Sequence, residues 1–174
     1  FLNKIKIFYP LSILFISSFM FCANLKSQEF ENITGIAKVI DGDTIKINSK
    51  KIRLFGIDAP EKKQFCKKIF LSISLISFKK DYACGEISTN FLKKKIDNKM
   101  IICKSIGMDR YKRHIAECFK GKKNINAFMV ENGQAVAYIK YSPKFITYEN
   151  NAKKEKSGLW AGTFEMPWVY RKKN

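Results

Sequence analysis

Histidine is almost absent from this chain, which has only His114 among its 174 residues. A ribonuclease mechanism that needs two histidines, or a metal centre built from several, cannot be assembled from it. The chain also lacks the GxxxxGKS/T phosphate loop, the HExxH zinc motif and the GxSxG nucleophile elbow. These absences point away from P-loop, zinc-protease and serine-hydrolase chemistry, and His114 is expected to be an ordinary strand residue.

Acidic residues are scarce beside basic ones, with 15 Asp and Glu against 33 Lys and Arg and a formal net charge of +18. A charge of this size favours polyanionic partners, either nucleic acid or an anionic membrane surface. The alternative is that the many lysines only solvate the surface. The charge alone leaves all three interpretations open.

The longest apolar run lies in residues 7–23, after Lys4 and Lys6 and before a polar stretch. This order is typical of a secretory signal peptide. The run is slightly shorter than the roughly 20 residues of a relaxed membrane span, so we expect cleavage, with retention as an anchor as the alternative. We therefore expect a signal peptide or anchor over 1–23, a linker over 24–34, and a periplasmic or secreted protein. Contact with a membrane is expected only through an uncleaved N-terminal segment.

Zinc-binding cysteine pairs are missing, since no CxxC occurs, and a zinc site is therefore the weaker interpretation of the cysteines. One of the five cysteines, Cys22, falls in the apolar run, and an even set remains: Cys66, Cys84, Cys103 and Cys118. In an oxidising compartment an even set predicts two disulfides, with three possible connectivities. A bridge between Cys66 and Cys84 would staple the segment between them and would be worth about 3 kcal/mol. Cys103 and Cys118 are expected on neighbouring strands, within reach of a bridge.

At this length one domain with its own core is expected, and short strands are predicted from residue 35 onwards. The runs 36–40 and 44–49 flank Asp41 and Gly42, a pair that favours a tight hairpin. The uncharged run 69–78 is too short to cross a bilayer, and its periodicity fits either a covered hairpin or a helix packed on the domain.

Helices are expected mainly in the second half of the chain. Helical spacing predicts an amphipathic helix over 86–97, with Ile87, Phe91, Leu92 and Lys95 at that spacing. The further predicted elements are two strands within 100–119, a helix over 124–132 with Asn124 as its N-cap and Gly133 just past its end, and a helix over 148–160 that stops near Gly158. Five short strands with helices late in the order predict an α+β domain, a small barrel with packed helices.

Carboxylates are expected to meet where two of the strands end. Asp43 follows the first hairpin turn, while Asp58 and Glu61 follow the strand 52–57, which Pro60 terminates. If those strands are neighbours, the three carboxylates converge on a hard oxygen site suited to Ca²⁺. The alternative is that "DGDT" is only good turn chemistry and "DAPE" only a good strand stop.

Two arginines sharpen the hypothesis of a phosphate site. Arg53 lies within the strand 52–57, on the face opposite Leu54, and Arg113 lies in the basic stretch "DRYKRHIAE". Guanidinium groups bind phosphate oxygens in a bidentate manner that lysine cannot match, and a pentacoordinate phosphate carries extra negative charge. Two arginines beside a cation held by carboxylates fit the cleavage of phosphodiester bonds. In a chain this basic, the alternative is two ordinary surface arginines.

Five blocks of the sequence together resemble the staphylococcal nuclease (thermonuclease) family: "VIDGDTIKI", "IRLFGIDAPE", "DRYKRHIAE", "INAFMVENGQAVAY" and "AKKEKSGLW". The similarity spans residues 35–162 in the family's order. It implies a five-stranded OB-fold barrel with about three packed α-helices over 35–162, followed by a basic C-terminal tail over 163–174. The resemblance also implies a calcium cofactor and a monomeric endonuclease with no obligate protein partner, which hydrolyses single-stranded DNA and RNA to 3′-phosphate products.

The resemblance implies a role for each matching residue. Calcium would be held by Asp43, Asp58 and the carbonyl of Ala59, with Asp41 behind them. Glu61 would act as general base on the attacking water, and Arg53 and Arg113 would bind the scissile phosphate. Arg110 and Tyr111 are similar to the pair that holds the terminal phosphate, and Tyr138 to an aromatic residue beside a base.

Two features depart from the family pattern. Lys112 stands where the family commonly has glycine, and the run 69–78 is expected beside the mouth of the site, where it would gate or block it. The cysteines in "QFC" and "YACG" look like those of exported bacterial relatives. Two other functions stay open: a non-catalytic OB-fold module that binds single-stranded nucleic acid, and a basic exported protein that acts on membrane surfaces.

Overall fold

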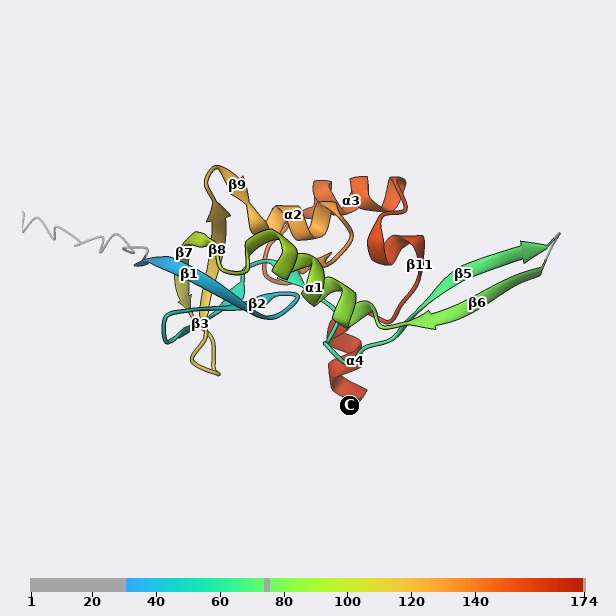
Figure 1. Cartoon of the computed structure of the whole chain (residues 1–174), viewed down its shortest axis with the longest axis horizontal. Coiled ribbons are helices and arrows are strands. Elements are labelled where there is room, and N and C mark those ends of the chain that lie inside the picture. Colours follow the sequence, from blue (N-terminus) through green and yellow to red (C-terminus); the bar gives the residue numbers. More distant parts are fainter. Residues whose placement is uncertain (1–30, 74–75, 174) are drawn as a thin grey trace, which may run out of the picture.

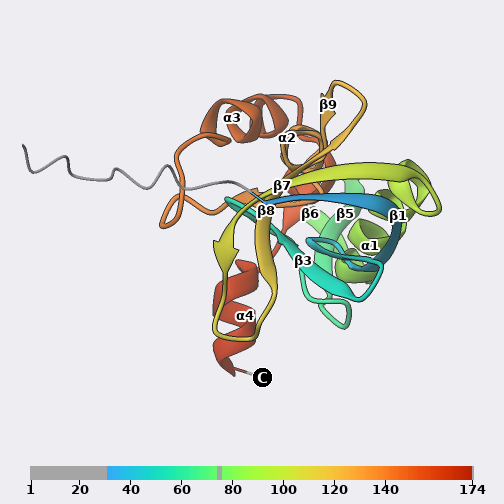
Figure 2. The same cartoon turned by 90° about the vertical axis from the view of Figure 1, so that its left-hand side faces the viewer.

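A closed barrel of five strands forms the body of the protein in the computed structural model, which describes residues 31–73 and 76–173. The strands are β1 (Glu31–Asp41), β2 (Thr44–Ile47), β3 (Lys50–Leu54), β7 (Met100–Met108) and β8 (His114–Lys120). They pair antiparallel in the order β3-β2-β1-β7-β8, and a parallel pairing of β3 with β8 closes the ring. Figure 2 faces this barrel, with β1, β3, β7 and β8 visible around it. The expected α+β OB-fold is confirmed.

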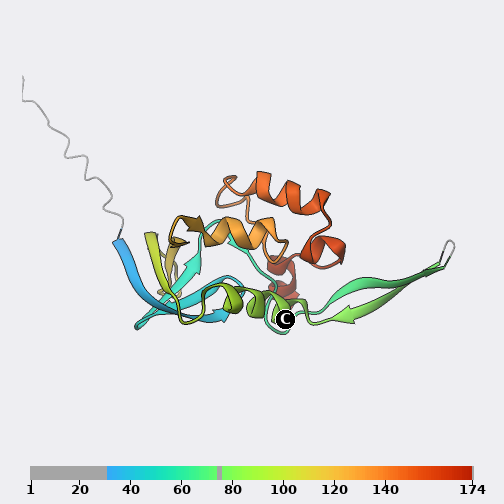
Figure 3. The ribbon, with the colours of Figure 1, turned by 45° about the horizontal axis from the view of Figure 1, so that its top comes forward.

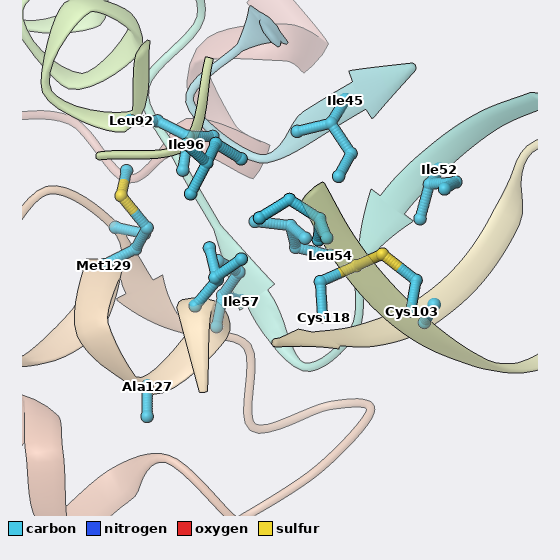
Figure 4. Packing of buried hydrophobic residues seen from close by; sticks show 14 of the residues in the cluster. Ile45, Ile52, Leu54, Ile57, Leu92, Ile96, Cys103, Cys118, Ala127 and Met129 are labelled. Atoms are coloured by element: carbon cyan, nitrogen blue, oxygen red, sulfur yellow. A yellow bond between two sulfur atoms is a disulfide. The ribbon is translucent and has the colours of Figure 1, made fainter. Parts of the chain in front are cut away.

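The β1–β2 hairpin forms where the sequence predicts it, with Asp41 opposite Thr44 across the turn. Alternation along the strands then sends every second side chain into the barrel, so that Ile45, Ile47, Ile52 and Leu54 are almost completely buried. Burying a side chain of this size contributes roughly 1.5–3 kcal/mol. Figure 4 shows Ile45, Ile52 and Leu54 near the Cys103–Cys118 disulfide, which crosses between two neighbouring strands as expected.

The described residues form four α-helices: α1 (Cys84–Ile96) and α2 (Ile125–Glu131), which contact barrel strands, and α3 (Ile146–Lys154) and α4 (Pro167–Lys173). Leu92 of the expected face enters the barrel core together with Ile96, and Phe91 packs against this core, whereas Ile87 is 47% exposed, so the inward face is shifted from the expected one at Ile87. The side chain of Asn124 accepts a hydrogen bond from the Ala127 N–H and caps α2 as predicted. The expected helix over 148–160 is divided into α3 and a 3₁₀ turn, Gly158–Ala161.

The shorter strands complete the topology. They are β4 (Ile57–Asp58), β9 (Lys123–Asn124), β10 (Val136–Ala137) and β11 (Gly162–Thr163). β4 pairs with β10, which places Asp58 opposite Val136, and β9 extends the sheet beyond β8. The strand expected over 52–57 is therefore divided by a turn at Phe55 and Gly56 into β3 and β4.

The uncharged run 69–78 belongs to a hairpin of β5 (Cys66–Ile73) and β6 (Ile76–Tyr82). Its strands extend away from the body in Figures 1 and 3, so it is not the covered hairpin or packed helix of the two expectations. Ile69 and Phe78 are each nearly half exposed. The Cys66–Cys84 disulfide closes the base of the hairpin, and β11 pairs with β5 there.

A second, smaller hydrophobic cluster lies at this base, centred on Cys66, Cys84, Val136 and Leu159. Trp168 of α4 packs against it, so the stretch expected as a basic tail is a docked helix. In Figures 1 and 2, α4 lies on the opposite side of the molecule from α3. The expected signal segment, 1–23, lies outside the described residues, among which no helix is long and apolar enough to cross a membrane.

Candidate active site

Asp43 and Ala59 are brought together by the close approach of the first hairpin turn to the end of β4. A Cβ on Gly42 would lie 2.7 Å from the Cβ of Ala59 and 2.2 Å from the Ser88 hydroxyl oxygen, so only glycine fits in this turn. The approach lets the Ala59 N–H donate to Asp43 Oδ2 over 2.9 Å. The turn therefore does more than reverse the chain, because it fixes one buried carboxylate against the backbone of the next acidic segment.

Arg53 joins the two buried carboxylates from the wall of the barrel. Its Nη1 donates to Asp43 Oδ1 over 2.7 Å and its Nη2 donates to Asp58 Oδ1. The β2–β3 register, in which Thr44 pairs with Arg53, and the short strand β4 hold these three side chains side by side. Asp43 is 3% exposed and Asp58 is fully buried, so the predicted convergence of these residues is observed.

Burial and mutual repulsion govern the charges in this group. Burial raises the pKa of Asp58, although the guanidinium groups of Arg171 and Arg53 oppose the shift. Burial alone would lower the pKa of Arg53, but Asp43 and Asp58 outweigh it and raise that pKa. Asp41 lies behind the pair. Burial and the nearby Asp43 carboxylate raise its pKa to about 7, so this carboxyl group ionises less readily than an ordinary aspartate. The site thus concentrates negative charge that two arginines only partly offset.

Glu61 is positioned by a tight loop that packs against the first turn of α1. Its N–H donates to the side-chain oxygen of Gln64, and the backbone N–H of Gln64 donates back to the Glu61 carbonyl over 2.7 Å. Gly85 allows the loop to come this close, because a Cβ there would lie 1.7 Å from the Glu61 carbonyl oxygen. The Glu61 side chain is 38% exposed, which leaves it open to water, unlike the two buried aspartates.

Arg171 completes the group from the last helix, and the sequence prediction did not include it. Its Nη1 donates to Asp58 Oδ1 over 3.0 Å and to Glu61 Oε1 over 2.7 Å, while its Nη2 donates to Asp58 Oδ2 over 2.8 Å. The residue lies in "YRKKN", within the expected basic tail. The signal that could have identified a helix is Pro167 followed by apolar residues, since proline is favoured in the first turn of a helix.

Arg113 is held away from the carboxylate group by its own loop. Its Nε donates to Asp109 Oδ2 over 2.7 Å, its Nη2 forms an ion pair with the same oxygen, and Asp109 Oδ1 accepts from the backbone N–H groups of Tyr111 and Arg113. Lys112 adopts φ +59°, the left-handed conformation that glycine favours, so the loop keeps its shape despite the lysine. The backbone of Arg113 adjoins β8, whose His114 pairs with Ile52 one residue before Arg53.

The other expected binding residues fall into two places. Arg110 donates to the Tyr111 hydroxyl and lies over its ring, so that pair forms one exposed unit at the tip of the β7–β8 loop. Tyr138 directly follows β10 and stacks on Trp168 of α4, with ring centroids 5.1 Å apart and planes within 2°. The β4–β10 pairing and the hydrogen bond from the Tyr138 N–H to the Gly56 carbonyl place this residue near the carboxylate group, and burial and the neighbouring Asp58 carboxylate raise the Tyr138 pKa.

The donor atoms fit a hard cation such as Ca²⁺, because two buried carboxylates lie next to the main chain of Ala59. In the conformation described for 31–73 and 76–173, no three Asp, Glu, His or Cys side chains are grouped closely enough to hold an ion. The third acidic side chain, Glu61, is connected to Asp58 through Arg171. Arg171 thus occupies carboxylate oxygens that a cation would need.

The geometry agrees with comparisons to known proteins. Residues 51–162, more than half of the chain, match the family described as Staphylococcal nuclease homologue. The chain belongs to the staphylococcal nuclease family. As a member of this family it is a nuclease, an enzyme that hydrolyses phosphodiester bonds. The matched span contains Arg53, Asp58, Glu61 and Arg113, while Asp43 precedes it and joins the group through its contacts with Arg53 and Ala59.

Individual relatives extend the match over most of the chain. An uncharacterized endonuclease of Escherichia coli O157:H7 is 31% identical over 172 residues, which covers 94% of this chain and 96% of the relative. An uncharacterized endonuclease of Haemophilus influenzae is 34% identical over 75% of this chain and 67% of the relative. The succinoglycan biosynthesis protein ExoI of Rhizobium meliloti is 33% identical over 75% of this chain and 65% of the relative.

Proposed function

We propose that this nuclease is a calcium-dependent endonuclease that cleaves single-stranded DNA and RNA and leaves 3′-phosphate ends. The observation that carries the proposal is the bridge of Arg53 between the buried carboxylates of Asp43 and Asp58. Burying two like charges side by side is costly, so a fold that does so is expected to use them.

Asp43, Asp58 and the Ala59 carbonyl would hold the calcium ion, since carboxylate and carbonyl oxygens are its preferred ligands. When bound, the ion supplies positive charge that polarises a phosphate oxygen. Arg53 has its guanidinium at the same carboxylates, so it would face a phosphate bound there and stabilise the charge that develops on it.

Glu61 suits the role of general base for the attacking water. It is the most exposed of the three carboxylates, so water reaches it, and its loop is fixed through Gln64 and Gly85. In-line attack at phosphorus would then expel the 5′-oxygen and leave the phosphate on the 3′ side. Arg113 would join by exchanging Asp109 for the phosphate, since its backbone adjoins the strand beside Arg53.

Substrate binding is assigned to exposed basic and aromatic side chains. Arg110 and Tyr111 would hold a terminal phosphate, and Tyr138 would stack on a base, which suits unpaired strands whose bases are accessible. The net charge of +18 favours any nucleic acid and gives no preference between DNA and RNA. We propose a monomer with no obligate protein partner.

We also propose that the protein is exported, to the periplasm or outside the cell. Two disulfides, Cys66–Cys84 and Cys103–Cys118, support this, because such bonds persist in oxidising compartments and are rare in the cytosol. Fractionation of cells that produce the full chain tests the proposal, and recovery of active protein with both disulfides only from the cytosol would contradict it.

The functional test is digestion of heat-denatured DNA and of RNA by the purified protein with Ca²⁺ and with a chelator. We expect cleavage only with Ca²⁺, and fragments that require phosphatase treatment before their 3′ ends can be extended. Glu61→Ser should lower the rate by 100-fold or more, by analogy with other groups that act on the transition state. Glu131→Ser, at an exposed carboxylate at the end of α2, is the matched control and should stay active.

A different experimental result would contradict each part of the proposed function. Cleavage that survives the chelator would contradict the calcium dependence, and full activity of Glu61→Ser would remove its role as base. Binding of single strands without cleavage would favour the non-catalytic OB-fold module, and binding to anionic liposomes without either would favour the membrane-surface protein.

A further inference from the structure

We propose that helix α4 is a built-in latch on the active site, in which Arg171 occupies the cation position until Ca²⁺ displaces it. This inference rests on the proposed function, because it concerns the same carboxylates. A guanidinium that belongs to the chain itself and a bound divalent cation would compete for the same oxygens.

The contacts of Asp58 show why the two states exclude each other. Asp58 Oδ1 accepts from Arg53 and Arg171, and its Oδ2 accepts from Arg171 alone over 2.8 Å. The same guanidinium also donates a hydrogen bond to Glu61 Oε1 over 2.7 Å. Both oxygens of the proposed calcium ligand and one oxygen of the proposed base are thus engaged by donors, which have no affinity for a cation.

Charge balance favours an exchange over simultaneous binding. Asp43, Asp58 and Glu61 carry three negative charges, and Arg53 and Arg171 carry two positive ones. If Arg171 leaves, the remaining four groups have a net charge of about −2, which a divalent cation neutralises. If Arg171 stays, the cation would enter a site with a net charge of about −1 and lie beside a second guanidinium.

The same helix also covers the surface proposed for a base. Trp168 is stacked on Tyr138, in the parallel geometry that a nucleobase would adopt on the same ring. One helix of seven residues therefore blocks the cation position with Arg171 and the stacking position with Trp168. A single movement of α4 would open both.

The attachment of α4 is partly exposed to solvent, which favours that movement. The Arg171 side chain is 34% exposed, against 18% for Arg53, and the helix follows the segment 164–166 rather than a strand of the barrel. Apart from Arg171, its contacts include the hydrogen bond from the Gln64 side chain to the Glu165 carbonyl, one from the Tyr170 hydroxyl to the Lys63 carbonyl over 3.4 Å, and the packing of Met166 and Trp168 on the small second cluster. Water and salt compete with partly exposed ion pairs of this kind.

The test is direct calcium binding, measured by titration calorimetry without nucleic acid, on the full chain and two variants. Arg171→Gln removes the competing charge, and we expect Ca²⁺ to bind at least about tenfold more tightly, since one charge-assisted hydrogen bond is worth that factor or more. Lys172→Gln removes the same charge from the adjacent residue, which is exposed, and should leave the affinity within about twofold.

A second readout follows the helix itself. Ca²⁺ should change the tryptophan emission of the wild-type protein as Trp168 leaves Tyr138, and Trp168→Phe should remove that change while Trp160 remains. Thermal unfolding of each variant without Ca²⁺ verifies that it is folded.

The outcomes separate the latch from the proposed function. Equal affinity, or weaker binding by Arg171→Gln in a folded variant, would overturn the latch and leave the calcium site intact. Absence of Ca²⁺ binding in wild type and Arg171→Gln alike would overturn both. Tighter binding by Lys172→Gln to the same extent would reduce the effect to net charge and also overturn the latch.

Discussion

The barrel core and the smaller cluster beside α4 hold opposite sides of the same carboxylates, and they do so with unequal strength. The barrel core is continuous, and it fixes Arg53 through strand pairing on both sides of β3. The smaller cluster has four fully buried residues and leaves the indole N–H of Trp160 buried, without a hydrogen-bond partner among the described residues. The barrel side of the site is therefore the rigid scaffold, and the α4 side is an element attached to that scaffold.

This difference explains how one aspartate can serve two arginines with different roles. Asp58 binds Arg53, whose backbone is held in the β3 ladder, and Arg171, which would leave with a short helix. Local stability varies across a structure, and elements with little buried surface open at the lowest cost. The predictions below test whether the two sides differ as this comparison requires.

The largest effect is expected when each arginine is replaced by the same residue. Arg53→Ala leaves Asp43 and Asp58 buried with a lost partner, so the free energy of unfolding should fall by about 3–5 kcal/mol and the nuclease rate by 100-fold or more. Arg171→Ala removes a partner that is one-third exposed, and the cost should be about 1 kcal/mol or less. Urea unfolding at pH 7 measures both values.

An equal loss of stability in the two variants would contradict the distinction between scaffold and latch. Arg53→Lys provides the control for charge, because it keeps the positive charge but cannot bridge both aspartates in the same planar geometry. We expect it to recover part of the stability and little of the activity.

The second comparison is between the two disulfides. We expect them to contribute similarly to the stability of the fold, but their removal to have different effects on function. They close loops with sequence separations of 15 and 18 residues, so removal of either should cost about 3 kcal/mol. Cys103→Ala/Cys118→Ala affects the barrel core and should leave the calcium affinity unchanged. Cys66→Ala/Cys84→Ala loosens the cluster beneath Trp168 and the loop that carries Glu61, so calcium affinity and activity should both change.

Urea unfolding and calcium titration of the two double variants test this contrast. Identical calcium affinities in both variants would show that the small cluster does not hold α4. A large change in affinity on loss of the barrel disulfide alone would reverse the comparison.

The fold could be predicted from the sequence wherever local signals and burial agree. Asp41 and Gly42 marked the first hairpin, Asn124 marked the start of α2, and the even set of cysteines marked the disulfides. The face of α1 was predicted wrongly at Ile87, because helical periodicity does not reveal that the small residues Ser88 and Gly85 lie against the turn at Gly42 and the loop at Glu61. Tertiary packing decided that face.

The carboxylate group was predictable because its members adjoin strand ends, whereas the contributions of α4 were not. Asp43, Arg53 and Asp58 lie within 16 residues, and strand pairing brings them together. Arg171 is 113 residues from Asp58, and its charge is indistinguishable in the sequence from that of the neighbouring lysines. Likewise, no local pattern indicates whether Arg113 pairs with Asp109 or turns toward a phosphate.

The smallest predicted effect concerns Asp109, which holds Arg113 apart from the scaffold. Burial alone would raise the pKa of Asp109, but hydrogen bonds from Arg113 and Tyr111 lower it below the ordinary value of 3.8. Ionised Asp109 therefore stabilises the fold above about pH 4, and this contribution is lost as the pH falls through the lower, folded-state pKa. Asp109→Asn should cost about 1 kcal/mol or less at pH 7 and nothing once wild-type Asp109 is protonated.

Unfolding at a series of pH values measures this difference, with Asp81→Asn at an exposed position of β6 as the control. A cost that persists unchanged at pH 2.5 would mean that the loop depends on the shape of the side chain and not on its charge. Arg53 and Arg113 would then differ in which carboxylates bind them. Arg53 is bound by carboxylates that also belong to the site, so it is fixed there. Arg113 is bound by one carboxylate outside the site, and a single exchange of partner would free it for the proposed phosphate.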